Sequence, residues 1–174
     1  MNAIRAETRT AAGRAAVDVE AILDCPRAVV FAAFSDARSR AQWCAPPGAD
    51  FRYLEATFAV GARDVFECLG PGGRTLRGEV RYEGIAPDQR IVYTETLFVG
   101  AALVSSAAIT VQFEVHSSTT TRVTMSADLG AGTTPEMVSG YTAGLRMAME
   151  GLRSWLTEPS RRSPHAAPDS GEHT

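Results

Sequence analysis

Glu95 is the residue whose type and position most directly suggest chemistry. It stands between Tyr93 and Leu97, in a run where apolar residues alternate with polar ones. If its side chain points into the protein, its charge is paired or its pKa is raised, and either state suits a ligand anchor or a general acid or base. If it points outward, it is a solubilising charge beside Arg81 on the neighbouring strand. Of these two orientations, we expect the outward one.

A group of mostly aromatic side chains accompanies Glu95 on the predicted strands and on the last predicted helix. Buried phenol groups need hydrogen-bond partners. These residues either line a ligand cavity or belong to an ordinary aromatic core. No catalytic residue stands out among them. The candidate ligand-binding residues are Trp43, at the mouth of the site, and Tyr53, Phe66, Tyr82, Tyr93, Glu95, Tyr141 and Leu145.

Other catalytic and metal-binding patterns are missing from the sequence. The glycine-rich segment 70–73 precedes a predicted strand, so it indicates a hairpin turn instead of a phosphate-binding loop. No His, Cys, Asp and Glu residues share the spacing of metal ligands, so we expect no metal and no cofactor. A cysteine–histidine catalytic pair would require the fold to bring a thiol to His116, and we expect reduced, buried thiols instead. The cysteines are Cys25, Cys44 and Cys68.

Composition limits the possible partners and the number of domains. A chain of 174 residues with 45% hydrophobic content can build one domain with a sizeable core. The net charge of -3 argues against nucleic-acid binding, which usually needs a basic face. No apolar run approaches the length of a membrane span, and the first residues lack the apolar segment of a secretory signal. We therefore expect a cytoplasmic protein.

A long amphipathic helix is predicted near the C-terminal end. Thr134 can cap it, Pro135 suits its first position, and Glu136 suits the positive first turn. Apolar residues then recur at intervals of three and four up to residue 156, so one face of the helix must be buried. They are Met137, Tyr141, Leu145, Ala148, Met149, Leu152, Trp155 and Leu156.

Strand patterns fill most of the chain before this helix, so the expected class is α+β. Short links between strands predict a meander, and about seven twisted antiparallel strands form a curved sheet. Residues 1–13 read as a loose lead-in, 99–106 as a loop or edge, and 158–174 as a disordered tail. The expected strands are 14–23, 50–59, 63–69, 75–85, 90–98, 107–115 and 121–129, and two short helices, 26–34 and 37–42, follow the first strand.

The predicted helix and sheet leave room for a cavity. A straight helix touches a strongly curved sheet along only part of its length, so a hollow can remain near one end. Gly140 and Gly144, in the N-terminal half of the helix, have no side chains to fill it. Cavities of this kind are apolar with a few polar groups and suit a small hydrophobic ligand.

The chain resembles the START-like (SRPBCC) helix-grip superfamily. Within it, the similarity is to bacterial single-domain relatives of the activator of heat shock protein 90 ATPase (the AHSA family). The segments that carry the resemblance are 25–34, 43–46, 70–73, 78–94 and 140–141 with the helix that follows. The resemblance spans roughly 14–157, which we take as one helix-grip domain. Tyr141 stands where the family often has tryptophan, and Ala62 where a second glycine is common.

Three functions are compatible with this resemblance. The first is binding of a small hydrophobic or aromatic molecule in the cavity, which we favour. The second is an enzyme of the polyketide cyclase, dehydratase or hydrolase kind that uses the same cavity. The third is a chaperone-contacting module, which we place last because the eukaryotic activator makes much of its chaperone contact through a separate N-terminal domain. An exposed edge at 101–108 could also pair with a second copy to form a homodimer.

Overall fold

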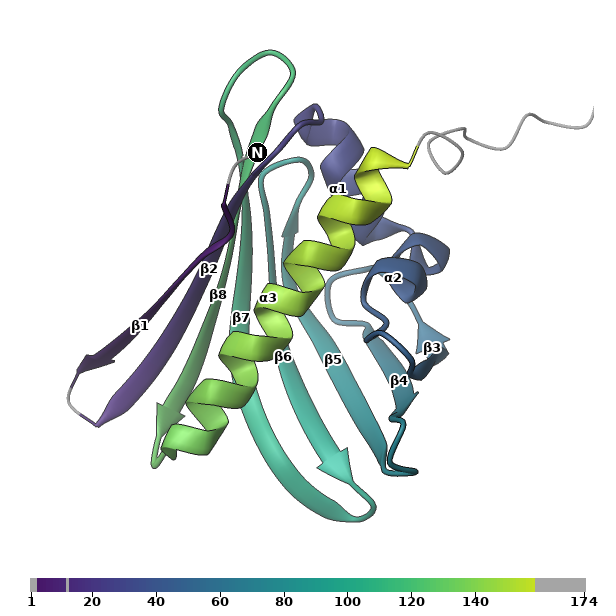
Figure 1. Ribbon diagram of the computed structural model, residues 1–174, viewed down its shortest axis with the longest axis vertical. Helices are drawn as coiled ribbons and strands as arrows, with labels where there is room; N and C mark the ends of the chain where they lie inside the picture. The colour runs from purple at the N-terminus through teal and green to yellow at the C-terminus, as the bar shows by residue number, and fades with distance from the viewer. Residues whose placement is uncertain (1–2, 12, 159–174) are drawn as a thin grey trace, which may run out of the picture.

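One antiparallel sheet curves around a long helix in this protein (Figure 1). The structure, a computed structural model, describes residues 3–11 and 13–158. Strands follow one another across the sheet in the order β1-β2-β8-β7-β6-β5-β4-β3, so the predicted meander runs from β3 to β8 and β2 joins its far edge. The strands are β1 (Arg5–Ala11), β2 (Arg14–Leu23), β3 (Asp50–Ala56), β4 (Arg63–Leu69), β5 (Thr75–Ala86), β6 (Arg90–Val99), β7 (Ala102–Val115) and β8 (Thr121–Ala131).

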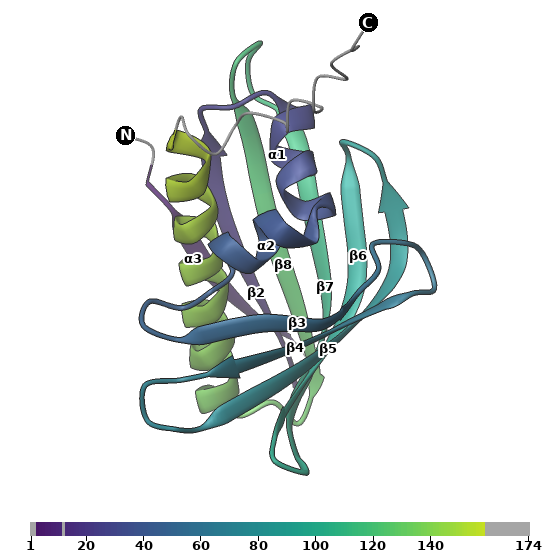
Figure 2. The same cartoon turned by 90° about the vertical axis from the view of Figure 1, so that its right-hand side faces the viewer.

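Three helices lie on the concave face of the sheet (Figure 2). They are α1 (Arg27–Ser35), α2 (Ala37–Trp43) and α3 (Pro135–Thr157). Asp36 ends α1 and caps α2, because its carboxylate accepts the backbone N–H of Ser39 at 2.9 Å. The predicted helix-grip α+β class is confirmed, with two short helices before the meander and one long helix after it.

The long helix α3 begins as the sequence predicts. The Thr134 hydroxyl accepts the N–H of Met137 at 3.3 Å, and Pro135 occupies the first turn. The predicted stripe is the buried face, although Met137, Ala148 and Trp155 at its margins are half-buried. This face packs mainly against β2 and α2. The buried residues are Tyr141, Leu145, Met149, Leu152 and Leu156.

The first strand corrects the prediction of a loose lead-in. Residues 5–11 pair with β2 from Arg5↔Glu20 to Ala11↔Arg14, so the sheet has eight strands instead of about seven. Nearly every residue of β1 is exposed, and an exposed edge strand shows no alternation of apolar residues. Its charged side chains discourage pairing with another chain. The predicted tail lies outside the described residues beyond Glu158.

Strand β7 also begins earlier than predicted. Residues 102–106, expected as a loop or edge, pair with β6 from Ala102↔Val99 to Ser106↔Thr96. Pairing of β7 with β8 begins only at Ala108↔Asp128. The start of β7 is therefore paired with β6 on one side and with no described strand on the other. Pairing of that edge with a second copy stays a prediction.

The two halves of α3 approach the rest of the protein differently. At Gly151 a Cβ atom would lie 2.2 Å from the carbonyl oxygen of Trp43, so only glycine lets α3 come this close to α2. At Gly140 and Gly144 a Cβ atom would meet nothing within 4 Å. The helix is therefore packed tightly at Gly151 in its C-terminal half, whereas open space lies beside Gly140 and Gly144 in its N-terminal half.

Candidate functional site

A cavity of about 500 Å³ occupies the space between the N-terminal half of α3 and the sheet. Strands β3 to β8, the end of α2 and the facing side of α3 all contribute to its wall. Gly140 and Gly144 line it, as the sequence predicted from their missing side chains. The structure also brings together every candidate ligand-binding residue, because all eight line this cavity: Trp43, Tyr53, Phe66, Tyr82, Tyr93, Glu95, Tyr141 and Leu145.

The mouth of the cavity lies between β7 and the first turns of α3. Three of the residues that line the cavity, Val104, Glu136 and Gly140, are exposed to solvent. Close to them, Ser105 of β7 donates a hydrogen bond to the Tyr141 hydroxyl of α3 at 3.4 Å. Trp43, which the sequence analysis placed at the mouth, is buried instead. Its indole N–H donates to the carbonyl of Ala33 at 3.0 Å, beneath the short helices.

Stacked aromatic rings form one wall of the cavity. The Phe66 ring stacks on Phe51, with centroids 5.1 Å apart. Phe66 faces Gly78 across the β4–β5 ladder, and a Cβ atom on Gly78 would lie 2.0 Å from the Phe66 ring. The missing side chain therefore lets the ring lie across the neighbouring strand. Tyr82 continues the wall and meets Tyr93 edge-to-face at 6.1 Å.

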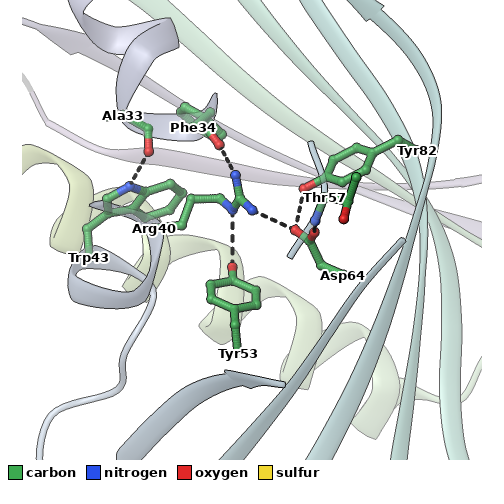
Figure 3. A network of polar contacts seen from close by, with 8 residues as sticks. All are labelled: Ala33, Phe34, Arg40, Trp43, Tyr53, Thr57, Asp64 and Tyr82. Atoms are coloured by element: carbon green, nitrogen blue, oxygen red, sulfur yellow. Dashed lines mark hydrogen bonds and ion pairs between the residues drawn. The ribbon is translucent and has the colours of Figure 1, made fainter. Parts of the chain in front are cut away.

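An ion pair between Arg40 and Asp64 closes the end of the cavity beneath α2 (Figure 3). Both side chains are almost fully buried, and the guanidinium Nη2 lies 2.7 Å from the Asp64 carboxylate. Arg40 also donates from Nε to the Tyr53 hydroxyl at 3.3 Å and from Nη1 to the carbonyl of Phe34. These bonds fasten α2 to β3, β4 and the end of α1.

Asp64 is surrounded by hydrogen-bond donors. Its Oδ2 accepts from the Tyr82 hydroxyl at 2.6 Å as well as from Arg40, and its Oδ1 accepts the backbone N–H of Thr57 at 2.7 Å. A buried carboxylate needs this degree of pairing to offset its lost hydration. The sequence gives no sign of this cluster, because Arg40 and Asp64 lie 24 residues apart on different elements and no local pattern links them.

Glu95 points into the cavity, so the expected outward orientation is wrong. On β6, the inward residues Ile91, Tyr93, Glu95 and Leu97 alternate with outward ones, whereas Arg81 faces the other side of the sheet opposite Thr94. Glu95 is half-buried, because the cavity beside it leaves part of its side chain uncovered. Burial raises the pKa of its carboxyl to about 7 from 4.5. The alternation with Tyr93 and Leu97 was the signal for this orientation.

Glu95 also lacks the partners that Asp64 has. None of the hydrogen bonds or ion pairs formed by the described residues involves its carboxylate. The ionisable groups nearest to it remain protonated at neutral pH, because burial raises the pKa of Cys44 to about 12 and that of Tyr141 to about 12. Burial also raises the pKa of Tyr93 well above its usual range. In Glu95 the site therefore offers a carboxyl group that no described residue pairs, within an apolar, aromatic enclosure.

This arrangement favours some kinds of chemistry over others. A carboxyl group with a pKa near neutrality can accept a hydrogen bond from a ligand, or can give and take a proton. No group of three or more His, Cys, Asp or Glu residues within 3–11 and 13–158 could hold a metal ion.

In the same ranges, no helix combines the length and apolar composition needed to cross a membrane.

Comparisons with known proteins agree with this architecture. The family model described as "Activator of Hsp90 ATPase homolog 1-like protein" matches residues 24–157. A solution structure of a protein from Arthrobacter aurescens has a TM-score of 0.77 at 21% identity, over 96% of this chain and 98% of that one. The Mll3558 protein from Rhizobium loti has a TM-score of 0.67 at 26% identity, over 87% and 98%.

A third similar structure comes from a biosynthetic locus. DynU16, a protein in the dynemicin biosynthetic locus, has a TM-score of 0.64 at 18% identity and covers 81% of this chain but 46% of its own. At that identity the likeness concerns the fold alone. No curated protein matches the chain.

Proposed function

The chain belongs to the activator of Hsp90 ATPase homolog 1-like family, and we propose that it binds a small hydrophobic or aromatic molecule in the cavity beneath α3. The observation that carries this proposal is the cavity itself, of about 500 Å³. That volume lies in the range of small-molecule sites in proteins, which are mostly apolar with a few placed polar groups. The aromatic wall and the carboxyl of Glu95 fit this description.

The packing of α3 supports a cavity that persists without a ligand. The Arg40–Asp64 cluster and the contact between Gly151 and Trp43 hold α2 against the sheet and α3 against α2. The N-terminal half of α3 cannot collapse onto β6 without disturbing these contacts at its other end. A largely preformed site avoids the free-energy cost of opening a pocket on binding.

A stability screen tests the proposal. We expect some apolar compounds of a diverse library to raise the melting temperature, since a ligand at about 100 times its Kd stabilises a protein by about 2.7 kcal/mol. The variant Gly144→Phe places a ring where a Cβ now has free space, and should abolish the shifts while folding normally. Ser154→Phe adds the same ring to an exposed position of α3 and is the matched control. Equal shifts in all three proteins would place the binding outside the cavity and contradict the proposal.

An enzyme that uses the same cavity is the second candidate, and Glu95 is the observation that favours it. A carboxyl group with a pKa of about 7 is suited to proton transfer near neutral pH. If the cavity holds a substrate of the polyketide cyclase, dehydratase or hydrolase kind, Glu95→Gln should lose turnover while it keeps substrate affinity. Unchanged turnover would remove Glu95 from the mechanism.

A chaperone-contacting role is the third candidate, and it rests on the family's description. It predicts a surface interaction that does not depend on the cavity. Gly144→Phe should then leave chaperone ATPase stimulation intact, whereas ligand binding should be lost. This variant therefore separates the cavity functions from an interaction at the surface.

A further inference from the structure

The charges that line the cavity are unbalanced in a way that restricts its ligand. Four charged residues contribute to the wall: Arg40, Asp64, Glu95 and Glu136. Arg40 and Asp64 neutralise each other at 2.7 Å. Glu136 is an exposed carboxylate at the mouth, and Glu95 stands inside the cavity without an ion-pair partner among the described residues. When Glu95 is ionised, the charge left over in the cavity is therefore negative.

We infer that the ligand is a cation: an aromatic or other apolar molecule that carries a protonated amine, which binds to the carboxylate of Glu95. This inference rests on the proposed function, since it specifies the chemistry of a molecule bound in the same cavity. A charge-assisted hydrogen bond between an ammonium group and a carboxylate is shorter and stronger than a neutral one. In a cavity with few other polar groups, such a bond would fix the ligand's orientation.

The surrounding rings favour a cation as well. Tyr93 and Tyr82 lie side by side on β6 and β5, and Tyr141 faces them from α3. The electron-rich faces of aromatic rings attract cations within about 6 Å. An ammonium group near Glu95 would thus have aromatic rings as well as a carboxylate around it, and these would replace much of its lost hydration.

Anionic ligands are disfavoured by the same geometry. Arg40 is the one cation that lines the cavity among residues 3–11 and 13–158, and its Nε, Nη1 and Nη2 already donate to Tyr53, Phe34 and Asp64. A ligand carboxylate or phosphate would enter without a free positive partner and would lie beside Glu95. Like charges in an apolar site repel strongly, so the cavity should reject fatty acids and aryl carboxylates.

The protonation of Glu95 makes this inference testable by pH. The titratable groups around it are Cys44 from the end of α2, Tyr82 from β5, Tyr93 from its own strand and Tyr141 from α3. Burial raises the pKa of each of these four groups, so they stay neutral below about pH 9. Affinity for an amine should therefore rise as the pH passes through about 7, where Glu95 ionises.

Three probes with a common ring system test the inference by calorimetry near pH 8: the cation aminomethylanthracene, the neutral ethylanthracene and the anion anthraceneacetate. The cation should bind about tenfold tighter than the neutral probe, or better, and the anion should bind most weakly. Glu95→Gln should abolish the preference for the cation. Glu114→Gln removes an exposed carboxylate from the outer face of the same sheet and should keep that preference.

The outcomes separate this inference from the proposed function. Equal affinity for the three probes, or a preference for the neutral or anionic one, overturns the cationic ligand while binding in the cavity stands. A preference for the cation that survives Glu95→Gln also overturns it, because another carboxylate is then responsible. If none of the probes binds, the inference fails, and the library screen with Gly144→Phe decides separately whether the cavity binds any apolar molecule.

Discussion

Asp64 and Glu95 are two acidic residues in the same row of the sheet that face the same cavity and differ in their partners. Asp64 pairs with Val80 across the β4–β5 ladder, and Val80 pairs with Glu95 across the β5–β6 ladder. The two carboxylates therefore stand two strands apart, with backbones about 10 Å apart at the usual strand spacing. Asp64 accepts hydrogen bonds from Arg40, Tyr82 and Thr57, whereas Glu95 accepts none from the described residues.

This difference separates the parts of the cavity that hold the fold from the part that is free to bind. At the α2 end, the Arg40 and Asp64 side chains bond to groups of the protein itself (Figure 3). In the open half, the Glu95 carboxylate forms no hydrogen bond or ion pair with the described residues, and a Cβ atom at Gly140 or Gly144 would meet nothing within 4 Å. Polar groups inside proteins are normally paired, so the carboxyl of Glu95 supports the proposed ligand.

The largest expected effect comes from breaking the paired region. Asp64→Ala leaves the Arg40 guanidinium buried without its counter-charge, and removal of one partner of a buried ion pair costs about 3–5 kcal/mol of the free energy of unfolding. Urea denaturation measures this loss. The exposed pair Arg52–Glu67 is the control, because Glu67→Ala should cost at most about 1 kcal/mol. A loss at Asp64 as small as that at Glu67 would mean that the cluster is not structural.

The next effect is the dependence of stability on pH that Glu95 causes. Its pKa is raised from 4.5 in the unfolded chain to about 7 in the folded protein, so the folded state holds the proton more tightly. The contribution of Glu95 to the free energy of unfolding is fully present below about pH 4.5. It is lost as the pH rises to about 7, and it stays constant above that pH. The total change corresponds to about 3 kcal/mol.

Glu95→Gln isolates this contribution, since glutamine cannot titrate. The difference in the free energy of unfolding between variant and wild type should shift in favour of the variant by about 3 kcal/mol between about pH 4.5 and 8. Denaturation at a series of pH values checks this. A constant difference across the series would show that Glu95 is as well solvated or paired in the folded protein as in the unfolded chain.

The smallest effects sharpen the contrast along α3 itself. Gly144→Ala adds a methyl group to free space and removes a helix glycine, so it should stabilise the protein by about 1 kcal/mol. Gly151→Ala makes the same chemical change where the Cβ meets the backbone of Trp43, and should destabilise it by roughly 1–3 kcal/mol. Thermal denaturation of both variants tests the pair. The same sign at both positions would contradict a helix that is tight at one half and open at the other.

The fold could be predicted largely from local patterns. The spacing of apolar residues and the Thr134 cap located α3, and alternation with turn residues located most strands within a few positions. Strand β1 escaped prediction because an exposed edge strand buries no face, and without a buried face there is no period to detect. The start of β7 escaped for a related reason, since its first residues are small, polar or exposed.

The candidate site was harder to predict, because its chemistry depends on long-range contacts. The aromatic residues and Glu95 were identified from their places on strands, but the orientation of Glu95 was wrong. An inward carboxyl must be paired or have a raised pKa, and the sequence alone does not show whether the fold provides either. The cavity gives the carboxyl space, and burial raises its pKa. The roles of Gly78 and Gly151 depend on Phe66 and Trp43, which approach them only in the folded protein.

A crystal structure with the most stabilising compound of the library screen tests the central claim most directly. We expect its density inside the cavity, between β6 and the N-terminal half of α3, with a donor atom within about 3 Å of a Glu95 carboxylate oxygen. The compound on an outer surface, or α3 packed flush against β6 with no enclosed space, would contradict a ligand-binding cavity.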